Sequence, residues 1–356
     1  MAVFKLKKGY DIRLAGEARS EVVSAPEPKR VALKPVEFRG IKPRLTVQEG
    51  DTVKAGTTLF HAKGNEDHKF SSPVSGRVVE INRGHRRVLL SIVIENDGKY
   101  ETEDFGSCEL KQISSMSREE VLAKVLKSGL LGVFTQRPFG NTANPEITPR
   151  DIFVSVFDSA PLAADPAIIA DGESVYFEAG VHAAAALTGG NVHVSVDGRA
   201  ADMTAFSVTH PKVKMHQFFG PHPSGNVGTQ IHHINAIRNR LDVVWTANAS
   251  DMILLGKMML TGKIDARRVV AVAGSAAPDA RYVRTVLGAE LTSILGGEVN
   301  DKTSRVICGN VLSGKHEGSD GFLGYHDQLV SVIPESVEPE FVGWMLPGGN
   351  KESFFR

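Results

Sequence analysis

The residues with the greatest capacity for chemistry are gathered in one stretch, residues 218–233. These sixteen residues hold three histidines, three glycines and two prolines. Imidazole nitrogens bind metals, exchange protons or hydrogen-bond to ligands. Glycine lets the backbone approach a ligand closely, and proline fixes the angle φ. The stretch therefore predicts a rigid, shaped loop. The candidate contact residues are Phe219, Gly220, His222, Gly225 and His232.

Other interpretations of the same stretch stay open. The loop can be structural, with its histidines only hydrogen-bonded, or it can contact a partner protein. Metal binding is weaker, although His210, His216, His222, His232 and His233 fall within 24 residues. If residues 230–235 form a strand, two adjacent histidines point to opposite faces and do not readily share one ion. No carboxylate is spaced with them as in a zinc motif, so we predict no metal site.

Alternating strands and helices are expected to position this loop. Strands are predicted at residues 151–157, 191–196, 215–219, 230–235 and 242–246. Three helical segments are predicted: one at 117–129 with a Ser117/Glu120 capping box, one from Asp165-Pro166 to Gly189-Gly190 with a break near Gly172, and one from Asn248 to Gly262. This order predicts a parallel, Rossmann-like sheet with the loop at a strand end. No G-x-G-x-x-G or Walker sequence occurs, so the nucleotide fingerprint is missing.

Three charged residues fall in loops near the predicted sheet edge: Arg137, Asp158 and Asp165. Such residues more often form helix caps and salt bridges than binding sites. We therefore interpret them first as structural residues.

The flanking regions carry different patterns. Short strands separated by turns between residues 31 and 97 predict a small all-β unit. Its "VQEGDTVKAG" (47–56) and "SPVSGRV" (72–78) resemble the biotinyl/lipoyl barrel-sandwich fold. Lys63 and Lys69 lack the flanking pattern of a carrier lysine, so we predict the fold without the carrier function. The pattern of residues 267–314 predicts two strands, a helix and a third strand, an order typical of a β-grasp module. One more strand is predicted at 328–333.

Composition narrows the class of protein. The chain has 356 residues, is 42% hydrophobic, and carries 41 basic and 41 acidic residues. Residues 1–100 hold 19 Lys and Arg against 12 Asp and Glu, so this basic third could meet an acidic partner or a membrane surface. Its lysines can equally be solvated, and no basic run suggests nucleic acid. No apolar run reaches the roughly 20 residues of a membrane span, and no secretory signal opens the chain. We expect a soluble, cytoplasmic protein.

Cysteine usage agrees with this class. Cys108 and Cys308 are the two cysteines, and they are far apart in the sequence. With no Cys-x-x-Cys, the chain cannot bind a cysteine-ligated iron–sulfur cluster or a zinc ribbon by itself. Two isolated thiols fit a reducing compartment.

Several long motifs together resemble one family. They are "SPVSGRV" (72–78), "FTQRPF" (134–139), "PLAADP" (161–166), "GPHPSG" (220–225), "VAGSAAPDARYVRTVLGAEL" (272–291) and "YHDQLVSVI" (325–333). The chain is similar in these motifs, and in their order, to the A subunits of the sodium-translocating NADH:quinone oxidoreductase (Nqr). The three-domain plan also resembles the C subunit of Rnf complexes and the NADH-binding flavoprotein subunit of complex I.

The resemblance implies a peripheral subunit on the cytoplasmic side of the bacterial inner membrane. Such a complex reduces ubiquinone with NADH and exports Na⁺. The resemblance places FMN, FAD, riboflavin and a [2Fe–2S] centre in partner subunits, and implies docking to those subunits, above all to the B subunit in the membrane. It implies no flavin or iron–sulfur centre in this chain, and the isolated chain is expected to be non-catalytic. Family members also run on into a cysteine-containing C-terminal segment, so we expect this chain to be truncated.

Two expectations about ligands follow from the resemblance. The position of the relatives' FMN loop matches residues 128–135, "SGLLGVFT", where Leu, Val and Phe replace the dense glycines. Those side chains keep backbone amides from a phosphate, so we expect flavin binding to be lost. Quinone carbonyls need an apolar slot with donors, which Phe218, Phe219, His222 and His232 could supply. The alternative is an independent flavin- or nucleotide-binding oxidoreductase with a degenerate complex I flavoprotein-like fold.

The predicted fold class is multidomain, α/β with β domains. It comprises an N-terminal arm (1–30), a barrel-sandwich hybrid domain (31–105) and a Rossmann-like parallel α/β domain without its nucleotide fingerprint (110–262). A β-grasp, SLBB-like domain (263–318) follows. The last part is a C-terminal strand and tail (319–356).

Overall fold

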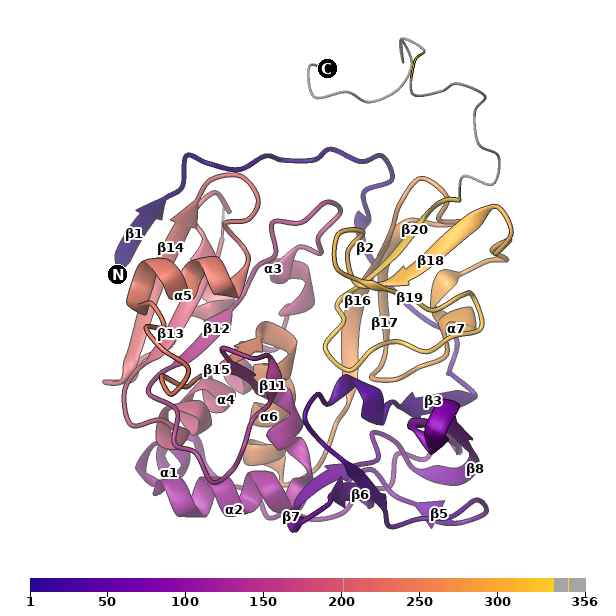
Figure 1. Ribbon diagram of the computed structural model, residues 1–356, viewed down its shortest axis with the longest axis horizontal. Helices are drawn as coiled ribbons and strands as arrows, with labels where there is room; N and C mark the ends of the chain where they lie inside the picture. The colour runs from indigo at the N-terminus through magenta and orange to yellow at the C-terminus, as the bar shows by residue number, and fades with distance from the viewer. Residues whose placement is uncertain (201, 336–344, 346–356) are drawn as a thin grey trace.

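The computed structural model describes residues 1–200, 202–335 and 345. Figure 1 shows three units: an α/β unit on one side and, on the other, a C-terminal β unit stacked on an N-terminal β unit. The predicted tail beyond residue 335 lies, apart from residue 345, outside the described residues. The buried side chains of the three units join in one continuous apolar cluster, so the interfaces between units are packed like domain cores.

A seven-stranded sheet in the order β1-β14-β13-β12-β15-β10-β11 forms the α/β unit. Its strands are β1 (Ala2–Lys5), β10 (Thr135–Arg137), β11 (Asn141–Thr142), β12 (Ile152–Ser155), β13 (Val192–Asp197), β14 (Val213–Phe219) and β15 (Val244–Asn248). The strands from β1 to β15 run parallel, whereas β10 pairs antiparallel with β15. The strand predictions at 151–157, 191–196, 215–219 and 242–246 are confirmed. Because parallel strands end at one edge, the loops after β12 and β15 lie together.

Helices α2, α3 and α6 of this unit begin at the residues that the capping signals indicate. They are α1 (Leu110–Ser115), α2 (Arg118–Ser128), α3 (Pro166–Ile169), α4 (Ser174–Leu187), α5 (Val227–Asn235) and α6 (Ala249–Thr261). Ser117 and Glu120 form the predicted reciprocal cap of α2, and Gly129 ends the helix in the left-handed conformation. Asp165 caps α3 and Asn248 caps α6, each by accepting a backbone N–H. These three predictions are confirmed.

The predicted strand at residues 230–235 is wrong, because this segment belongs to helix α5. Val227, Ile231 and Ile234 are spaced by four and three residues, which places them on one helical face. That face packs against Phe153 and Val244 of the sheet. Without Val227 the segment 230–235 shows only two apolar residues, which are too few to indicate a helical face.

The predicted barrel-sandwich fold is present in the N-terminal β unit. One sheet contains β3 (Arg30–Leu33), β9 (Leu89–Asn96), β8 (Gly76–Arg83) and β5 (Thr52–Val53); the other contains β4 (Pro43–Leu45), β6 (Thr58–Ala62) and β7 (Asn65–Ser71). Short 3₁₀ turns lie at Pro35–Glu37 and His85–Arg87 in this unit, and at Leu130–Val133 and Thr204–Phe206 in the α/β unit. In the core of the N-terminal unit Phe60 and Phe70 stack on each other, and the ring of Phe38 is tilted against both.

A six-stranded sheet in the order β19-β18-β20-β16-β17-β2 forms the C-terminal unit. Its elements are β2 (Arg19–Ser24), β16 (Arg267–Ala273), β17 (Arg281–Val286), α7 (Leu291–Leu295), β18 (Ser304–Cys308), β19 (Lys315–His316) and β20 (Leu329–Pro334). The strand predicted at 328–333 is β20. It lies inside this sheet, antiparallel to β18 and parallel to β16.

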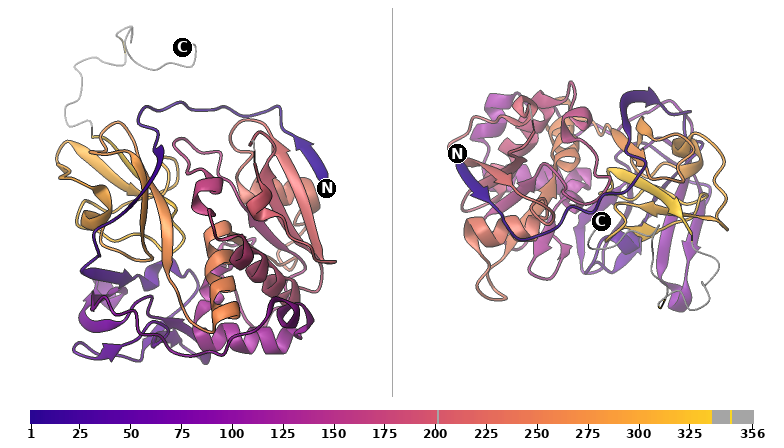
Figure 2. Two further views of the ribbon diagram at one scale, coloured as in Figure 1. Left: turned by 180° about the vertical axis from the view of Figure 1, so that it is seen from behind. Right: turned by 90° about the horizontal axis from the view of Figure 1, so that it is seen from above.

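The N-terminal arm adds a strand to each of two sheets. β1 extends the α/β sheet beside β14, and β2 extends the C-terminal sheet beside β17. Between the two strands the chain crosses from one unit to the other, as Figure 2 shows. Gly9 lies against the carbonyl of His222, and Gly16 lies against Gly274. The arm is therefore fastened to both units that it connects.

Helices α4 and α6 pack closely against each other, and glycine makes this possible. A Cβ on Gly180 of α4 would overlap the carbonyl of Met252, and one on Gly256 of α6 would overlap the carbonyl of Tyr176. Most residues of both helices are buried in the core, so neither helix can retreat without disturbing it.

We predict that Gly180→Ala lowers the free energy of unfolding by about 2–4 kcal/mol, because the added methyl group forces the two helices apart. Chemical denaturation followed by circular dichroism measures this change. Gly228→Ala is the matched control: this glycine of α5 has open space around its Cβ position. The control should be neutral or stabilise by up to about 1 kcal/mol. Equal effects of the two substitutions would contradict the packing argument.

Candidate functional site

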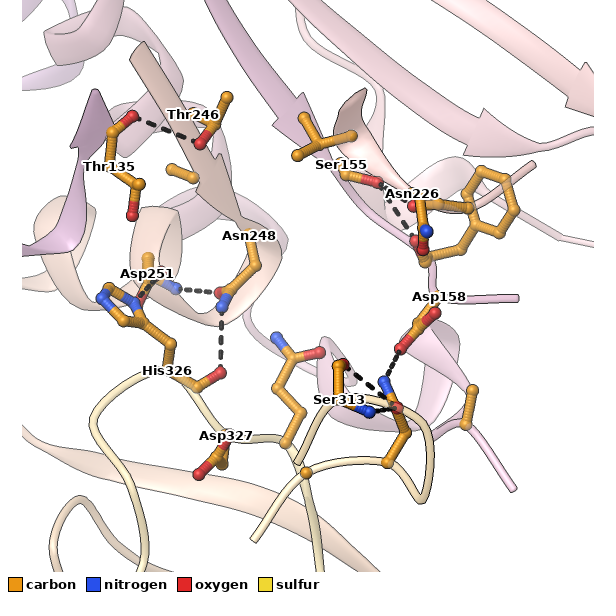
Figure 3. A pocket seen from close by; sticks show the side chains of 18 of the residues that line it. Thr135, Ser155, Asp158, Asn226, Thr246, Asn248, Asp251, Ser313, His326 and Asp327 are labelled. Atoms are coloured by element: carbon orange, nitrogen blue, oxygen red, sulfur yellow. Dashed lines mark hydrogen bonds and ion pairs between the residues drawn. The ribbon is translucent and has the colours of Figure 1, made fainter. Parts of the chain in front are cut away.

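A cleft of about 820 Å³ lies between the α/β unit and the C-terminal unit. The ends of β12 and β15, the segment leading into β10, the first turn of α5 and two loops of the C-terminal unit form its walls (Figure 3). This is the edge where the parallel strands end, so its position follows from the sheet topology. Among its lining residues are Thr135, Arg137, Ser155, Asp158, Gly225, Asn226, Thr246, Asn248, Asp251, Asn310, Ser313, His326 and Asp327.

One wall of the cleft carries a histidine fixed by a buried carboxylate. The Oδ2 of Asp251 lies 2.8 Å from Nδ1 of His326. Asn248 donates from Nδ2 to the backbone carbonyl of His326 at 3.1 Å, and its Oδ1 caps α6 (Figure 3). Burial opposes a charge on His326, but the nearby carboxylates, Asp251 first, raise its pKa. With Nδ1 engaged, Nε2 is the ring nitrogen left for a ligand or solvent.

A second carboxylate, Asp327, lies in a crowded acidic environment. Burial and the neighbouring Glu37 raise the pKa of Asp327 to about 6. Glu37 belongs to the N-terminal unit, where its carboxylate lies 3.2 Å from Nζ of Lys34 and accepts the backbone N–H of Tyr325. Asp327, which lines the cleft, therefore lies close to the N-terminal unit, and burial together with Glu37 keeps the pKa of its carboxyl group well above the ordinary value.

The loop after β14 is held in place by the arm and by the loop after β12. The hydroxyl group of Ser159 forms a hydrogen bond with Nδ1 of His222 at 3.1 Å. The same hydroxyl oxygen accepts the backbone N–H of Gly225. Asp11 of the arm accepts the backbone N–H of His222 at 3.0 Å. His222 is thus partly buried by structural partners.

The five sequence-selected residues are not brought together. Gly225 lines the cleft, and His222 lies next to it under the arm. Gly220 lies against the carbonyl of Leu6, and Phe219 covers Gly198. His232 is exposed on α5, where its ring contacts His233. A single pocket built from all five residues is therefore not present among the described residues, although the two nearest the cleft remain candidates.

The sequence reasoning missed a buried pair of histidines. Nδ1 of His193 lies 2.9 Å from Nε2 of His216, and the other ring nitrogen of His193 lies 3.6 Å from Asp151. Burial and the charge of His193 lower the pKa of His216 to about 4. Burial opposes ionisation of Asp151, but the nearby imidazole of His193 and the hydrogen bond from the backbone N–H of Asn191 outweigh it and lower its pKa to about 2. These contacts join β12, β13 and β14, so their evident role is structural.

Two of the three charged loop residues behave as the sequence predicts. Asp165 caps α3, and Asp158 accepts from its own loop and from Nδ2 of Asn310 at 3.1 Å. The salt-bridge interpretation of Arg137 is wrong: within residues 1–200, 202–335 and 345 it forms no ion pair and no hydrogen bond through its side chain. Arg137 is instead one of the residues that line the cleft.

Neither a metal cluster nor a membrane span is found in the described part of the chain. No three His, Cys, Asp or Glu side chains there are arranged to hold a metal ion. Over the same residues, no helix has the length and apolar character needed to cross a bilayer.

Comparison with known families matches each unit in turn. Residues 4–97 match the NqrA N-terminal barrel-sandwich hybrid domain, residues 116–264 the NqrA second alpha/beta domain, and residues 269–317 the NQRA C-terminal (SLBB) domain. The chain is 39% identical over 357 residues to the A subunit of the Na(+)-translocating NADH-quinone reductase from Serratia proteamaculans (strain 568). It is 38% identical over 352 residues to that of Vibrio parahaemolyticus. Each alignment covers 99% of this chain and 78% of the relative.

Among solved structures, a similar chain occurs in an NAD+-reducing [NiFe]-hydrogenase in the air-oxidized state. It shares 11% identity, with a TM-score of 0.40, over 67% of this chain and 52% of that chain. A likeness this distant has no bearing on function.

We predict that Asp327→Asn stabilises the protein at pH 8 and not at pH 4. The folded-state pKa of Asp327 is about 6, above the ordinary value of 3.8, so ionisation costs stability as the pH rises through this window. The neutral amide removes a cost of about 1–3 kcal/mol above pH 7. Thermal melts from pH 4 to pH 8 measure the difference. Exposed Asp320→Asn is the control; a gain for Asp327→Asn that does not depend on pH would contradict the assignment.

Proposed function

This chain belongs to the NqrA family, the A subunits of the Na(+)-translocating NADH-quinone reductase, and we propose that it acts as the A subunit of such a complex. The observation that carries the proposal is the match of all three units, in order, to the three domains of that family. The relatives named above are components of an enzyme that oxidises NADH, reduces quinone and translocates Na⁺.

The position of the chain in this complex follows from the same premise. We infer a peripheral subunit on the cytoplasmic side of the bacterial inner membrane, docked to other subunits, with the membrane-embedded B subunit as the main partner. The α/β domain is inferred to be a Rossmann-like domain. The domain boundaries are placed at 1–30, 31–105, 110–262, 263–318 and 319–356.

We propose that the redox centres lie in partner subunits rather than in this chain. The segment that matches the relatives' flavin loop supports this. Its residues Leu130–Val133 form a buried 3₁₀ turn, and a Cβ on Gly132 would overlap the ring of Phe38 from the N-terminal unit. Packing against another domain leaves this backbone little room to surround a phosphate.

The subunit role is tested by complementation. Membranes of the source organism that lack this chain should lose Na⁺-stimulated NADH:quinone reductase activity, and expression of the tagged chain should restore it. The tagged chain should also co-purify the other subunits of the complex. Restoration by an empty vector, or a purified chain that retains stoichiometric flavin, would contradict the proposal. Retained flavin would favour the alternative of an independent flavoenzyme.

We further propose that the loop after β14 contributes to quinone binding. His222 and Gly225 support this, because one lies beside the cleft and the other lines it. The hydrogen bond between His222 and Ser159 fixes the imidazole, and the ring remains partly exposed. A fixed donor next to an open cleft suits a quinone carbonyl.

We predict that a soluble ubiquinone analogue binds the purified chain saturably and that His222→Ala weakens this binding about tenfold, because the donor is lost. Tryptophan fluorescence, to which buried Trp245 contributes, follows the titration. His85→Ala, in an exposed turn of the N-terminal unit, is the matched control. The quinone site is rejected if the wild-type chain shows no saturation, or if both variants bind alike.

A further inference from the structure

The turn between β8 and β9 carries a cluster of basic side chains. Residues 83–90 hold Arg83, Arg86 and Arg87 together with His85, and they include no acidic residue. All four basic residues are exposed. None of the three arginines forms an ion pair within the part of the chain that the structure describes. The turn is therefore a concentrated positive charge at one place on the surface.

The acidic residues that flank this turn in the sequence are placed against other arginines. Glu80 of β8 lies 3.5 Å from Nη1 of Arg30. Glu95 of β9 lies opposite Arg30 on one neighbouring strand and opposite Arg77 on the other. The positive charge of the turn is thus left for a partner other than the described residues.

Two apolar side chains lie within the same turn. Val88 is 49% exposed and Leu90 is 41% exposed. Leu90 lies over the turn itself, because its Cδ1 is 3.1 Å from the position that a Cβ on Gly84 would occupy. A single exposed apolar residue is ordinary on a protein surface. Two of them among arginines without ion pairs form a surface that is both apolar and cationic.

The backbone of the turn is unusual for arginine. Arg86 and Arg87 have φ angles of 55° and 60°. This left-handed region favours glycine and asparagine, because a Cβ there crowds the neighbouring carbonyl. In the described chain no ion pair of either side chain offsets this cost. Backbone outliers of this kind point to function rather than to stability of the fold.

The turn is separate from the cleft and from the quinone proposal. Strand β8, which leads into it, lies on the side of the N-terminal unit that faces away from the α/β unit (Figure 1). No residue of His85–Arg87 is buried. None of residues 83–90 is among those that line the cleft.

We propose that this turn binds the surface of a bilayer that contains anionic lipids. The arginines would contact lipid phosphates, and Val88 and Leu90 would reach the apolar boundary behind the headgroups. Guanidinium groups form paired hydrogen bonds to phosphate oxygens. Each arginine close to an anionic membrane strengthens binding roughly fivefold. The apolar side chains favour a bilayer over nucleic acid or a purely acidic protein surface, because a bilayer has hydrocarbon behind its phosphates.

Co-sedimentation of the full chain with lipid vesicles tests the proposal. We expect binding to vesicles of phosphatidylglycerol and phosphatidylcholine, weakened by salt, and little binding to phosphatidylcholine alone. Arg86→Gln/Arg87→Gln should weaken binding at least about tenfold. The matched control, Arg238→Gln/Arg240→Gln, removes two exposed arginines from the loop after α5, which also exposes Leu241. It should bind within about twofold of the wild type, since only long-range attraction is lost.

Two further variants separate the contributions to binding. Val88→Ser leaves the charge unchanged and should weaken vesicle binding about threefold, because less apolar surface is buried. Arg86→Gly/Arg87→Gly separates binding from folding. Glycine suits the positive φ angles, so this variant should melt at least as high as the glutamine variant while it loses as much vesicle binding.

Each remaining outcome overturns the site. Absence of binding to anionic vesicles, or equal binding by Arg86→Gln/Arg87→Gln and the control, would reject the turn as a lipid contact. Unchanged binding of Val88→Ser, or binding of duplex DNA as tight as that of vesicles, would reject a bilayer as the partner. The inference goes beyond the proposed subunit role, because it concerns lipid and uses the purified chain alone. Failure of complementation, which is measured with the other subunits present, is therefore a separate result.

Discussion

The geometry of the cleft depends on a lysine buried where the three units meet. Nζ of Lys34 lies 3.2 Å from Glu37 and 2.9 Å from Glu317, and it donates to the carbonyl of Phe322. Burial disfavours its charge, but the two carboxylates outweigh this effect and raise its pKa. Removal of one partner from such a cluster leaves an uncompensated buried charge, which is strongly destabilising. The cluster therefore fixes the C-terminal unit on the N-terminal one.

The α/β unit joins this arrangement through adjacent residues. Glu37 also accepts the backbone N–H of Tyr325, and the next residue, His326, binds Asp251 at the start of α6. Arg268 is buried beside them and donates to the carbonyl of Tyr325. One short segment of the C-terminal unit thus contacts both other units. Because it also lines the cleft, the shape of the cleft and the docking of the units depend on the same few contacts.

The sequence predicted features that depend on local interactions. The caps at Ser117, Asp165 and Asn248 each bind a backbone amide two or three residues away, so their pattern is visible in a short window. The family motifs likewise indicated the three domains, which the family models confirm. The helix after the loop was missed because Val227, which completes its apolar face, lies among residues that signal a turn.

Features of the cleft could not be predicted in this way. His326 and Asp251 are 75 residues apart, and neither lies in a recognisable catalytic motif. Among the described residues no carboxylate forms an ion pair with Arg137, and no window of sequence reveals the lack of a spatial neighbour. Histidines drew attention to the loop after β14, although most of them pack within the sheet or face solvent.

The N-terminal arm has a consequence for the order in which the chain can fold. β1 pairs with residues 216–219. β2 pairs with residues 281–284, with a shift of register between residues 281 and 282. The arm precedes both of its partner strands in the chain by more than 200 residues, so it leaves the ribosome before they are synthesised. During synthesis the arm has no sheet to join, and the N-terminal β unit can fold while the arm is still free. The arm is therefore placed late although it is made before its partner strands, and its docking adds the edge strands of two sheets.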